Sequence, residues 1–309
     1  MSPRAPTATA GVSDPPARTG AAEGPLLDVR GITVTYGTVT AVAGADLTVA
    51  DGEVVGLIGP NGAGKTTLID AIGGFVPGCR GQVRLAGRAL ARSPAHDRVR
   101  AGLARTFQSS ELFPDLTVRE NLAVAVRRAR RGSWLLDAVA PRRSAAVTAE
   151  RVDAILADLG LEREADAAPH ELPHGRRRLV DLARALATDP RVVMLDEPAA
   201  GLDDGESAAL GSVIRRLPDR GVAVLLVDHD MGLVMSSCAR VHVLDLGRVI
   251  AVGTPDEVRA DPAVVQAYLG PPTDEAPTDE APTDGPATDR PASHRPATTD
   301  EAAADGAST

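Results

Sequence analysis

The hydrophobic pattern of this chain predicts a mixed α/β protein. Apolar and polar residues largely alternate over 27–36, and a second β-rich stretch spans 41–49, which is typical of strands with one buried face. Continuous apolar runs at 54–58, 191–195 and 221–227 are instead typical of parallel strands buried on both faces. We therefore expect two kinds of sheet.

Helices are expected mainly between the first and second of these apolar runs. Thr117 is a plausible N-cap, and Glu120 completes a capping box for a helix that runs to about Arg131. Apolar residues at helical spacing from 147 to 159 predict another helix. The section from about 100 to 187 is thus expected to be mostly helical.

The last part of the ordered chain is expected to form a hairpin and two short helices. Strand-like residues at 241–246 and 249–252 predict the hairpin, one helix begins at about Pro255, and the other reaches Tyr268. With the stretches above, these elements give an ordered domain at 25–270.

Both ends of the chain have compositions that do not favour folding. Residues 1–24 are rich in Pro, Ala, Thr and Gly without periodicity, and we expect a disordered arm. PTDEA occurs at 272–276 and again at 277–281, so residues 271–309 are expected to be a solvated acidic tail. The tail holds nine acids and two arginines, a balance of −7 within a net charge of −9. The charge therefore says little about the substrate of the ordered domain.

Composition also bears on the core and on redox state. Aromatic residues are only 2% of the chain, so the core must be built from Ala, Val, Leu and Ile. Cys79 and Cys238 lie far apart without ligand partners, which favours reduced thiols over a disulfide or metal site. No apolar run approaches the ~18 residues of a membrane span, so we expect any membrane link to come through a partner.

The strongest candidate for chemistry is the sequence GPNGAGKTT at 59–67, called here the phosphate loop. It stands between a predicted strand and a predicted helix, as a G-x-x-x-x-G-K-[ST] nucleotide site requires. Its glycines let main-chain N–H groups curl around phosphate oxygens, while a lysine reaches the β- and γ-phosphates and a hydroxyl reaches Mg²⁺. We expect ATP and Mg²⁺ as cofactors, bound by Gly59, Asn61, Gly62, Ala63, Gly64, Lys65, Thr66 and Thr67.

The basic residues support this interpretation. The chain has 32 arginines and a single lysine, and that lysine is Lys65. Arginine has therefore been accepted everywhere except where a compact ammonium suits the site better than a planar guanidinium.

Hydrolysis needs a metal ligand, a base and a γ-phosphate contact, and polar residues at strand ends provide candidates. Asp196 ends an apolar run and could hold Mg²⁺, while the adjacent Glu197 could act as general base toward water. His229 follows the next apolar run and could reach the γ-phosphate. The alternative is a histidine at a strand end that has only a structural role. Tyr36 ends a strand upstream of the loop, and it could stack on a base or be an ordinary edge-strand residue.

Together these motifs resemble the nucleotide-binding subunit of ATP-binding cassette (ABC) transporters. The resemblance covers about residues 25–270 and rests on Tyr36, GPNGAGKTT, Gln108, LDEP at 195–198, AGLD at 200–203 and His229. It implies an α/β fold of the P-loop NTPase, ABC ATPase type, with a mixed sheet core, an antiparallel β subdomain and an α-helical subdomain. It also implies site roles: Tyr36 stacks on adenine, Gln108 contacts Mg²⁺ and water, Asp203 lies at a dimer interface, and His229 is a switch histidine.

Longer segments are similar to the LivG-like ATPases of branched-chain amino acid importers. They are GLARTFQ at 102–108, LFPDLTVRENL at 112–122, DEPAAGL at 196–202, DHDMGLVM at 228–235 and VVQAYLG at 264–270. The resemblance implies transmembrane permease subunits and a second, different ATPase as partners, with a solute-binding protein acting indirectly. It implies a place at the cytoplasmic face of the membrane and no nucleic acid. Importers of urea and short amides share much of the pattern.

One motif departs from the family. Its signature LSGGQ, which closes on the nucleotide of the other subunit, is here LPHGR at 172–176. Pro173 offers neither hydroxyl nor amide N–H, Gly175 keeps one close backbone approach, and Arg176 could supply a charged contact instead. We hypothesise that this signature serves a partner's nucleotide poorly while the chain's own phosphate loop remains competent.

Two other function classes remain open at this point. A soluble ABC ATPase of translation or DNA repair would resemble tandem cassettes or carry long coiled-coil insertions, and neither feature is present. A regulatory module that binds ATP with little hydrolysis is compatible with the altered signature.

Overall fold

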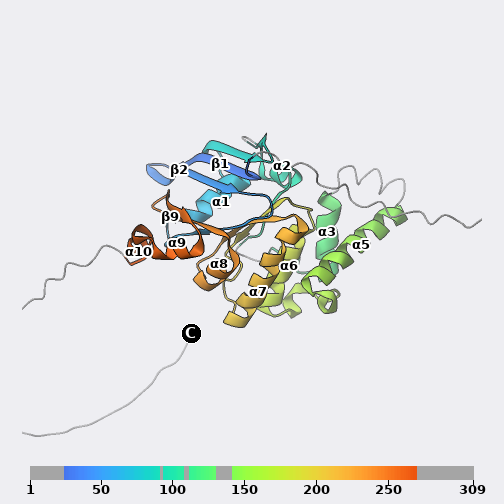
Figure 1. Ribbon diagram of the computed structural model, residues 1–309. Coiled ribbons are helices and arrows are strands. Elements are labelled where there is room, and N and C mark those ends of the chain that lie inside the picture. The colour runs from blue at the N-terminus through green and yellow to red at the C-terminus, as the bar shows by residue number, and fades with distance from the viewer. Residues whose placement is uncertain (1–23, 91–92, 108–110, 130–140, 270–309) are drawn as a thin grey trace, which may run out of the picture. The chain divides into compact units, whose positions relative to one another are not determined.

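The computed structural model describes residues 24–90, 93–107, 111–129 and 141–269. These residues form two sheets and a set of helices that pack against them (Figure 1). Residues 1–23 of the arm predicted at 1–24, and the tail predicted at 271–309, lie outside the described residues. Within the described part, no helix combines the length and the apolar character needed to span a membrane.

The larger sheet contains the buried apolar runs. Its strand order is β10-β9-β3-β8-β7-β6, with β9, β3, β8, β7 and β6 parallel and β10 antiparallel to β9. Every residue of β3, β7 and β8 is buried, because helices and the second sheet cover both faces. The strands are β3 Val54–Ile58, β6 Leu103–Arg105, β7 Val192–Asp196, β8 Ala223–Val227, β9 Arg240–Asp245 and β10 Arg248–Gly253.

The smaller sheet is antiparallel, with the order β2-β1-β4-β5. Its strands are β1 Leu27–Tyr36, β2 Val39–Val49, β4 Arg80–Leu85 and β5 Arg88–Ala89. Helix α1, Lys65–Gly73, lies against β1 and β2 and shares a hydrophobic core with them. The sheet therefore holds the first helix in place from one side.

A group of helices packs together beside the larger sheet (Figure 1). Helix α3 (Val118–Ala129), α5 (Pro141–Leu159) and α6 (His174–Leu186) contact one another, and α7 (Asp204–Arg216) packs on α6. The remaining helical elements are α2 Ala95–Arg100, η1 Glu162–Glu164, η2 Pro169–Glu171, η3 Pro218–Arg220, α8 Met231–Ser237, α9 Pro255–Ala260 and α10 Pro262–Leu269.

Several predicted elements are confirmed and two need correction. The Thr117 hydroxyl accepts from the Glu120 amide at 3.2 Å, and the Glu120 carboxylate accepts from the Thr117 amide at 2.9 Å, so the predicted capping box exists. Helix α5 begins at Pro141, earlier than predicted, because proline suits a first helical turn. Strand β6 lies inside the section predicted to be mostly helical, since three residues are too few to show a period.

Candidate phosphate site

The phosphate loop connects β3 to α1, and neighbouring backbone closes on its glycines. A Cβ on Gly59 would lie 2.0 Å from the Leu244 carbonyl oxygen of β9. A Cβ on Gly64, whose φ is +101°, would lie 2.4 Å from the Ala41 carbonyl oxygen of β2. Only glycine fits these two positions, because both the torsion and the space exclude a side chain.

Lys65 is the first residue of α1 and its side chain turns back over the loop. The ammonium donates to the Gly59 carbonyl at 2.7 Å and to the Pro60 carbonyl at 3.0 Å. Burial lowers the pKa of Lys65, and the nearby carboxylates of Glu197 and Asp196 act in the opposite direction. The phosphate loop, β7 and its following turn are thus within electrostatic reach of one another.

The first turn of α1 has features that suit an anion. No side chain caps it, so its amides are not covered from within the loop. Thr66 is exposed in this turn, and Thr67 is half-buried beside it. Asn61 and Gly62 are also exposed, while Ala63 is buried.

Asp196 and Glu197 stand where β7 ends. Asp196 is buried with 4% of its surface exposed, and its Oδ2 lies 2.7 Å from Nη2 of Arg105. Glu197 has a positive φ of 46°, and its amide donates to the Val227 carbonyl of β8 at 2.7 Å. The turn after β7 is therefore fixed to β8 through the backbone.

His229 follows β8 and lies close to Glu197. Its Nδ1 is 4.0 Å from Oε2 of Glu197 and 3.6 Å from Oδ1 of Asp228, and its side chain is 60% exposed. The structure thus brings together two residues that are far apart in sequence but were both expected at this site.

Asp228 is a buried acceptor that the sequence did not single out. Its Oδ1 accepts from the amides of His229 at 2.8 Å and Asp230 at 3.0 Å, and its Oδ2 accepts from the Ala199 amide at 2.9 Å. The carboxylate thus ties the turn after Glu197 to the segment that carries His229. The run of polar residues directly after β8 was the only signal in the sequence.

Arg105 is a second residue that sequence reasoning missed. Its guanidinium bonds Asp196 and also Asp70 of α1, and its side chain is 7% exposed. It also lies over the rings of Phe75, at 5.5 Å, and Phe107, at 5.1 Å. An arginine next to a short apolar segment offers no pattern that could have predicted these contacts.

The other expected residues have different surroundings. Tyr36 ends β1, is exposed, and lines a pocket of about 200 Å³ with Phe75 and Val76. Gln108 lies outside the described residues. Asp203 is the N-cap of α7 and accepts from the Glu206 amide at 2.8 Å.

The signature segment at 172–176 makes contacts within this chain. Pro173 is the N-cap of α6 without a side-chain hydrogen bond, and a Cβ on Gly175 would lie 2.6 Å from the Glu206 carboxylate. Arg176 is bound instead by Glu164, 2.6 Å away, and by the Gly160 carbonyl. The guanidinium of Arg176 is thus held within this chain, and the charged contact that it was expected to make to a partner's nucleotide stays a prediction.

The donor set fits a magnesium nucleotide. A threonine hydroxyl at the first turn of α1 and one buried carboxylate at the end of β7 are hard oxygen ligands, as Mg²⁺ prefers. Few protein ligands are needed, because phosphate oxygens and water complete such a site. The glycine cradle and the buried ammonium suit the phosphates themselves.

Comparisons with known proteins agree with this site. Residues 42–200 match the ABC transporter family model, and residues 248–270 match that of the branched-chain amino acid ATP-binding cassette transporter. The chain is 40% identical over 250 residues to the high-affinity branched-chain amino acid transport ATP-binding protein BraF of Pseudomonas aeruginosa, covering 80% of this chain and 98% of the relative. It is 38% identical over 250 residues to LivG, the corresponding protein of Escherichia coli K12, with the same coverage.

A solved structure extends the agreement to the fold. An ATP-binding cassette of an ABC transporter in its ADP conformation has a TM-score of 0.69 and 29% identity, covering 80% of this chain and 100% of that structure. The predicted fold class and the family resemblance are confirmed.

Proposed function

Because the chain belongs to the ABC transporter ATP-binding family, we propose that it is the ATP-hydrolysing subunit of an importer of branched-chain amino acids. The substrate class is supported by the names of BraF and LivG and by the match at 248–270. The convergence of Lys65, Asp196 and Glu197 on one site carries the enzymatic part of the proposal.

In this proposal the phosphate loop binds the triphosphate of ATP. The amides of residues 59–67 and the ammonium of Lys65 contact phosphate oxygens, and Tyr36 stacks on adenine. Thr66, Asp196 and Gln108 would hold Mg²⁺, which neutralises charge on the β- and γ-phosphates when bound. Asp203 and Gly175 would face the second subunit.

Glu197 is the proposed general base. It takes a proton from water in line with the γ-phosphate, and His229 orients that water and the γ-phosphate. Support comes from the 4.0 Å between Glu197 and His229 and from the hydrogen bonds of Asp228, which hold both segments.

The proposed partners are transmembrane permease subunits and a second ATPase, with a solute-binding protein acting through the permease. The chain would then act at the cytoplasmic face of the membrane. The contacts of Arg176 favour a heterodimer. The signature of this chain is held within its own subunit, so a second copy would complete the phosphate loop poorly, and a different ATPase would supply the signature that the loop needs. An importer of urea or short amides is the alternative.

Uptake by whole cells tests this proposal. In a strain that lacks this gene, we expect loss of radiolabelled leucine uptake, restoration by the wild-type chain, and no restoration by Lys65→Ala. Proline uptake is the control for membrane energisation. Normal leucine uptake with lost urea uptake would overturn the substrate class in favour of the alternative.

A further inference from the structure

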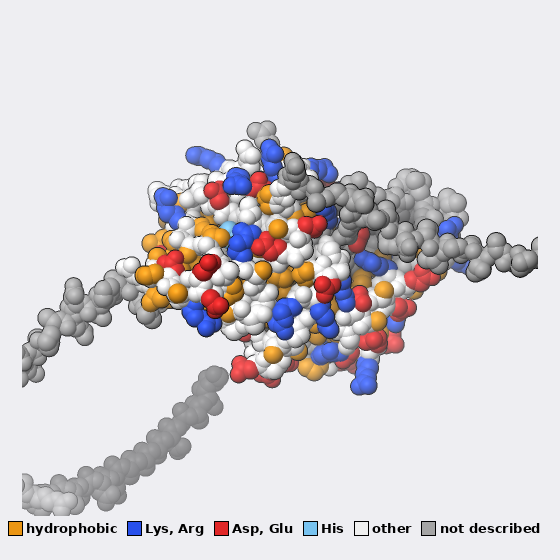
Figure 2. Space-filling model, viewed as in Figure 1, with side chains coloured by type: hydrophobic (Ala, Val, Ile, Leu, Met, Phe, Trp, Pro, Cys, Tyr) orange, Lys and Arg blue, Asp and Glu red, His pale blue; other side chains and the backbone are white. Residues whose placement is uncertain are grey.

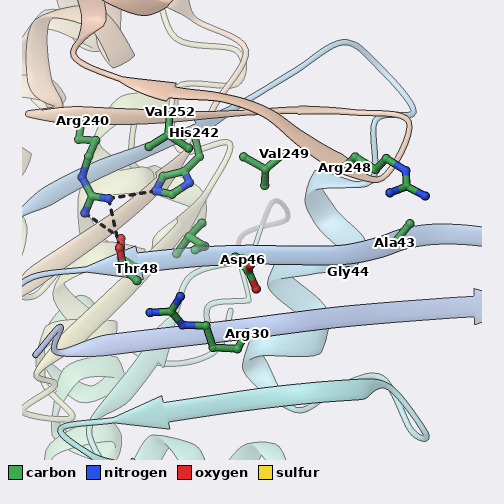
Figure 3. Close-up of a pocket in the computed structure, with 11 residues that line it drawn as sticks. Arg30, Ala43, Gly44, Asp46, Thr48, Arg240, His242, Arg248, Val249 and Val252 are labelled. Atoms are coloured by element: carbon green, nitrogen blue, oxygen red, sulfur yellow. Dashed lines mark hydrogen bonds between the residues drawn. The ribbon is translucent and has the colours of Figure 1, made fainter.

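A pocket of about 510 Å³ lies between the two sheets, apart from the phosphate site (Figure 3). Residues of β1 and β2 line one side, and residues of the β9–β10 hairpin line the other. Arg248 and Ala43 lie at one end of the pocket in Figure 3, and Arg240 and Thr48 lie at the other.

His242 lines this pocket, and its ring carries a buried donor in the pocket wall. Nε2 of its ring is 3.4 Å from Nη1 of Arg240. A guanidinium can only donate, so Nε2 accepts and the ring hydrogen is on Nδ1. Burial, with help from Arg240, lowers the pKa of His242 to about 4, so the ring is neutral near pH 7.

The hydrogen on Nδ1 has no acceptor. Nδ1 is buried without a hydrogen-bond partner in the described part of the chain, and only 4% of His242 is exposed. A buried donor that remains unpaired is costly, and an acceptor supplied by a ligand would remove that cost.

Only part of the charge around the pocket is balanced within the protein. Glu53 binds Arg240 at 2.8 Å, which compensates that guanidinium. Arg248 is exposed and makes no ion pair with the described residues. Asp46 accepts from the Gly31 amide through Oδ1 at 2.6 Å, which leaves Oδ2 for another donor.

The remaining wall is apolar. Val249 and Val252 of β10 face the pocket, and Figure 3 shows both across from Asp46. The pocket thus offers a cation and an N–H donor for a carboxylate, a carboxylate for an ammonium group, and an aliphatic surface.

We propose that this pocket binds an aliphatic α-amino acid as its zwitterion. The ligand carboxylate accepts from Arg248 and, after a small shift of the buried His242 ring toward the pocket, also from its Nδ1, and the ligand ammonium donates to Asp46. Its side chain packs on Val249 and Val252. A simple anion fits less well, because Asp46 repels it. That this ligand is also the transported solute rests on the proposed function. The chemical class of the ligand rests on the pocket alone.

The walls of the pocket are bonded to the phosphate loop. The Ala43 amide of β2 donates to the Gly247 carbonyl at 2.8 Å, and the Gly247 amide donates to the Ala63 carbonyl at 2.9 Å. Gly247 is the turn of the β9–β10 hairpin, and its own Cβ would lie 2.7 Å from the Ala41 carbonyl. A ligand that draws β10 toward β2 therefore acts on the loop, and amino acid and nucleotide alter each other's affinity by the same factor.

Titration calorimetry of the purified, nucleotide-free full chain with L-leucine tests the site. We expect saturable binding of leucine. The affinity should be lower by about tenfold or more for 4-methylpentanoate, which lacks the amine, and for 3-methylbutylamine, which lacks the carboxylate. No saturable binding at millimolar leucine would overturn the proposal. Equal affinity for leucine and 4-methylpentanoate would overturn the zwitterion class.

Variants assign the binding to this pocket. Arg248→Gln and Asp46→Asn should each weaken leucine binding by about tenfold or more, and Asp46→Asn keeps the acceptor for Gly31. Arg84→Gln, an exposed arginine of β4, is the matched control. Arg248 is exposed, so its substitution should not disturb folding. Unchanged binding by Arg248→Gln and Asp46→Asn together would place leucine elsewhere and overturn the proposal.

The coupling is measured as ADP affinity with and without saturating leucine. We expect saturating leucine to change the ADP affinity by some factor. ADP should then change the leucine affinity by the same factor and in the same direction. An unchanged ADP affinity would overturn the coupling. These assays involve neither hydrolysis nor transport. The pocket proposal can therefore fail while the leucine uptake test succeeds, and the uptake test can fail while the pocket still binds leucine.

Discussion

Nη2 of Arg105 lies 2.7 Å from Oδ2 of Asp196, so the proposed Mg²⁺ ligand already has a buried cation beside it. The same guanidinium bonds Asp70, and it packs on the rings of Phe75 and Phe107. One side chain therefore joins the end of β6, the first helix and the carboxylate of β7.

Replacing Arg105 by Gln should reduce the free energy of unfolding by about 3 kcal/mol, because two carboxylates lose a buried partner. Urea unfolding followed by circular dichroism measures this change. Arg100→Gln is the matched control, since its ion pair with Asp97 is exposed, and it should cost less than about 1 kcal/mol. Equal effects of the two substitutions would contradict a buried role for Arg105.

Replacing Glu197 by Gln should abolish ATP hydrolysis while ATP-dependent dimers persist, because the amide cannot take a proton but keeps the shape of the side chain. Phosphate release measures the rate, and size-exclusion chromatography with MgATP measures dimers. Glu150→Gln, an exposed glutamate of α5, is a control outside the site. An unchanged rate in Glu197→Gln would count against Glu197 as the base.

Replacing Asp228 by Asn should lower kcat more than it changes KM, because Asp228 positions His229 and the turn after Glu197 without contacting nucleotide itself. The amide also turns one acceptor into a donor that faces a backbone N–H, at a cost of about 2 kcal/mol in stability. Steady-state kinetics and urea unfolding measure both. Asp219→Asn, an exposed aspartate of η3, should change neither. A rise in KM without a fall in kcat would contradict the positioning role.

The purified chain alone should hydrolyse ATP far more slowly than the complex with its proposed second ATPase, because Pro173 supplies no donor and Arg176 is held by Glu164. Pro173→Ser restores a hydroxyl and an amide N–H, and it should raise turnover of the chain alone by about tenfold or more. Pro218→Ser, at the first residue of η3, is the control. Wild-type turnover that matches the assembled complex would refute the hypothesis.

His242 should make the fold acid-sensitive. The pKa of His242 is about 4 in the folded chain and 6.5 in the reference state. Below pH 6.5 the imidazole therefore binds a proton in the unfolded chain but stays neutral in the folded chain. Stability from this group is therefore present above pH 6.5 and is lost as the pH falls toward 4. Between about pH 7 and pH 5, wild type should lose about 2 kcal/mol more than His242→Phe in urea unfolding. Parallel losses in the two proteins would exclude His242 as the source.

The sequence by itself determined the features that depend on neighbouring residues. The phosphate loop could be predicted because its glycines, lysine and threonine act within nine consecutive positions between a strand and a helix. The capping box of Thr117 and Glu120 spans one helical turn, and the buried strands follow from apolar runs. Such features need only local torsions and local hydrogen bonds.

Only the tertiary structure decided which distant residues meet. Arg105 reaches Asp196 because β6 and β7 are neighbours in the sheet, and Asp228 reaches Ala199 because β7 lies next to β8. The pocket around His242 exists because β2 and β10 come together from opposite ends of the domain. Strand order creates these contacts, and the period of apolar residues along a strand carries no information about which strand lies beside it.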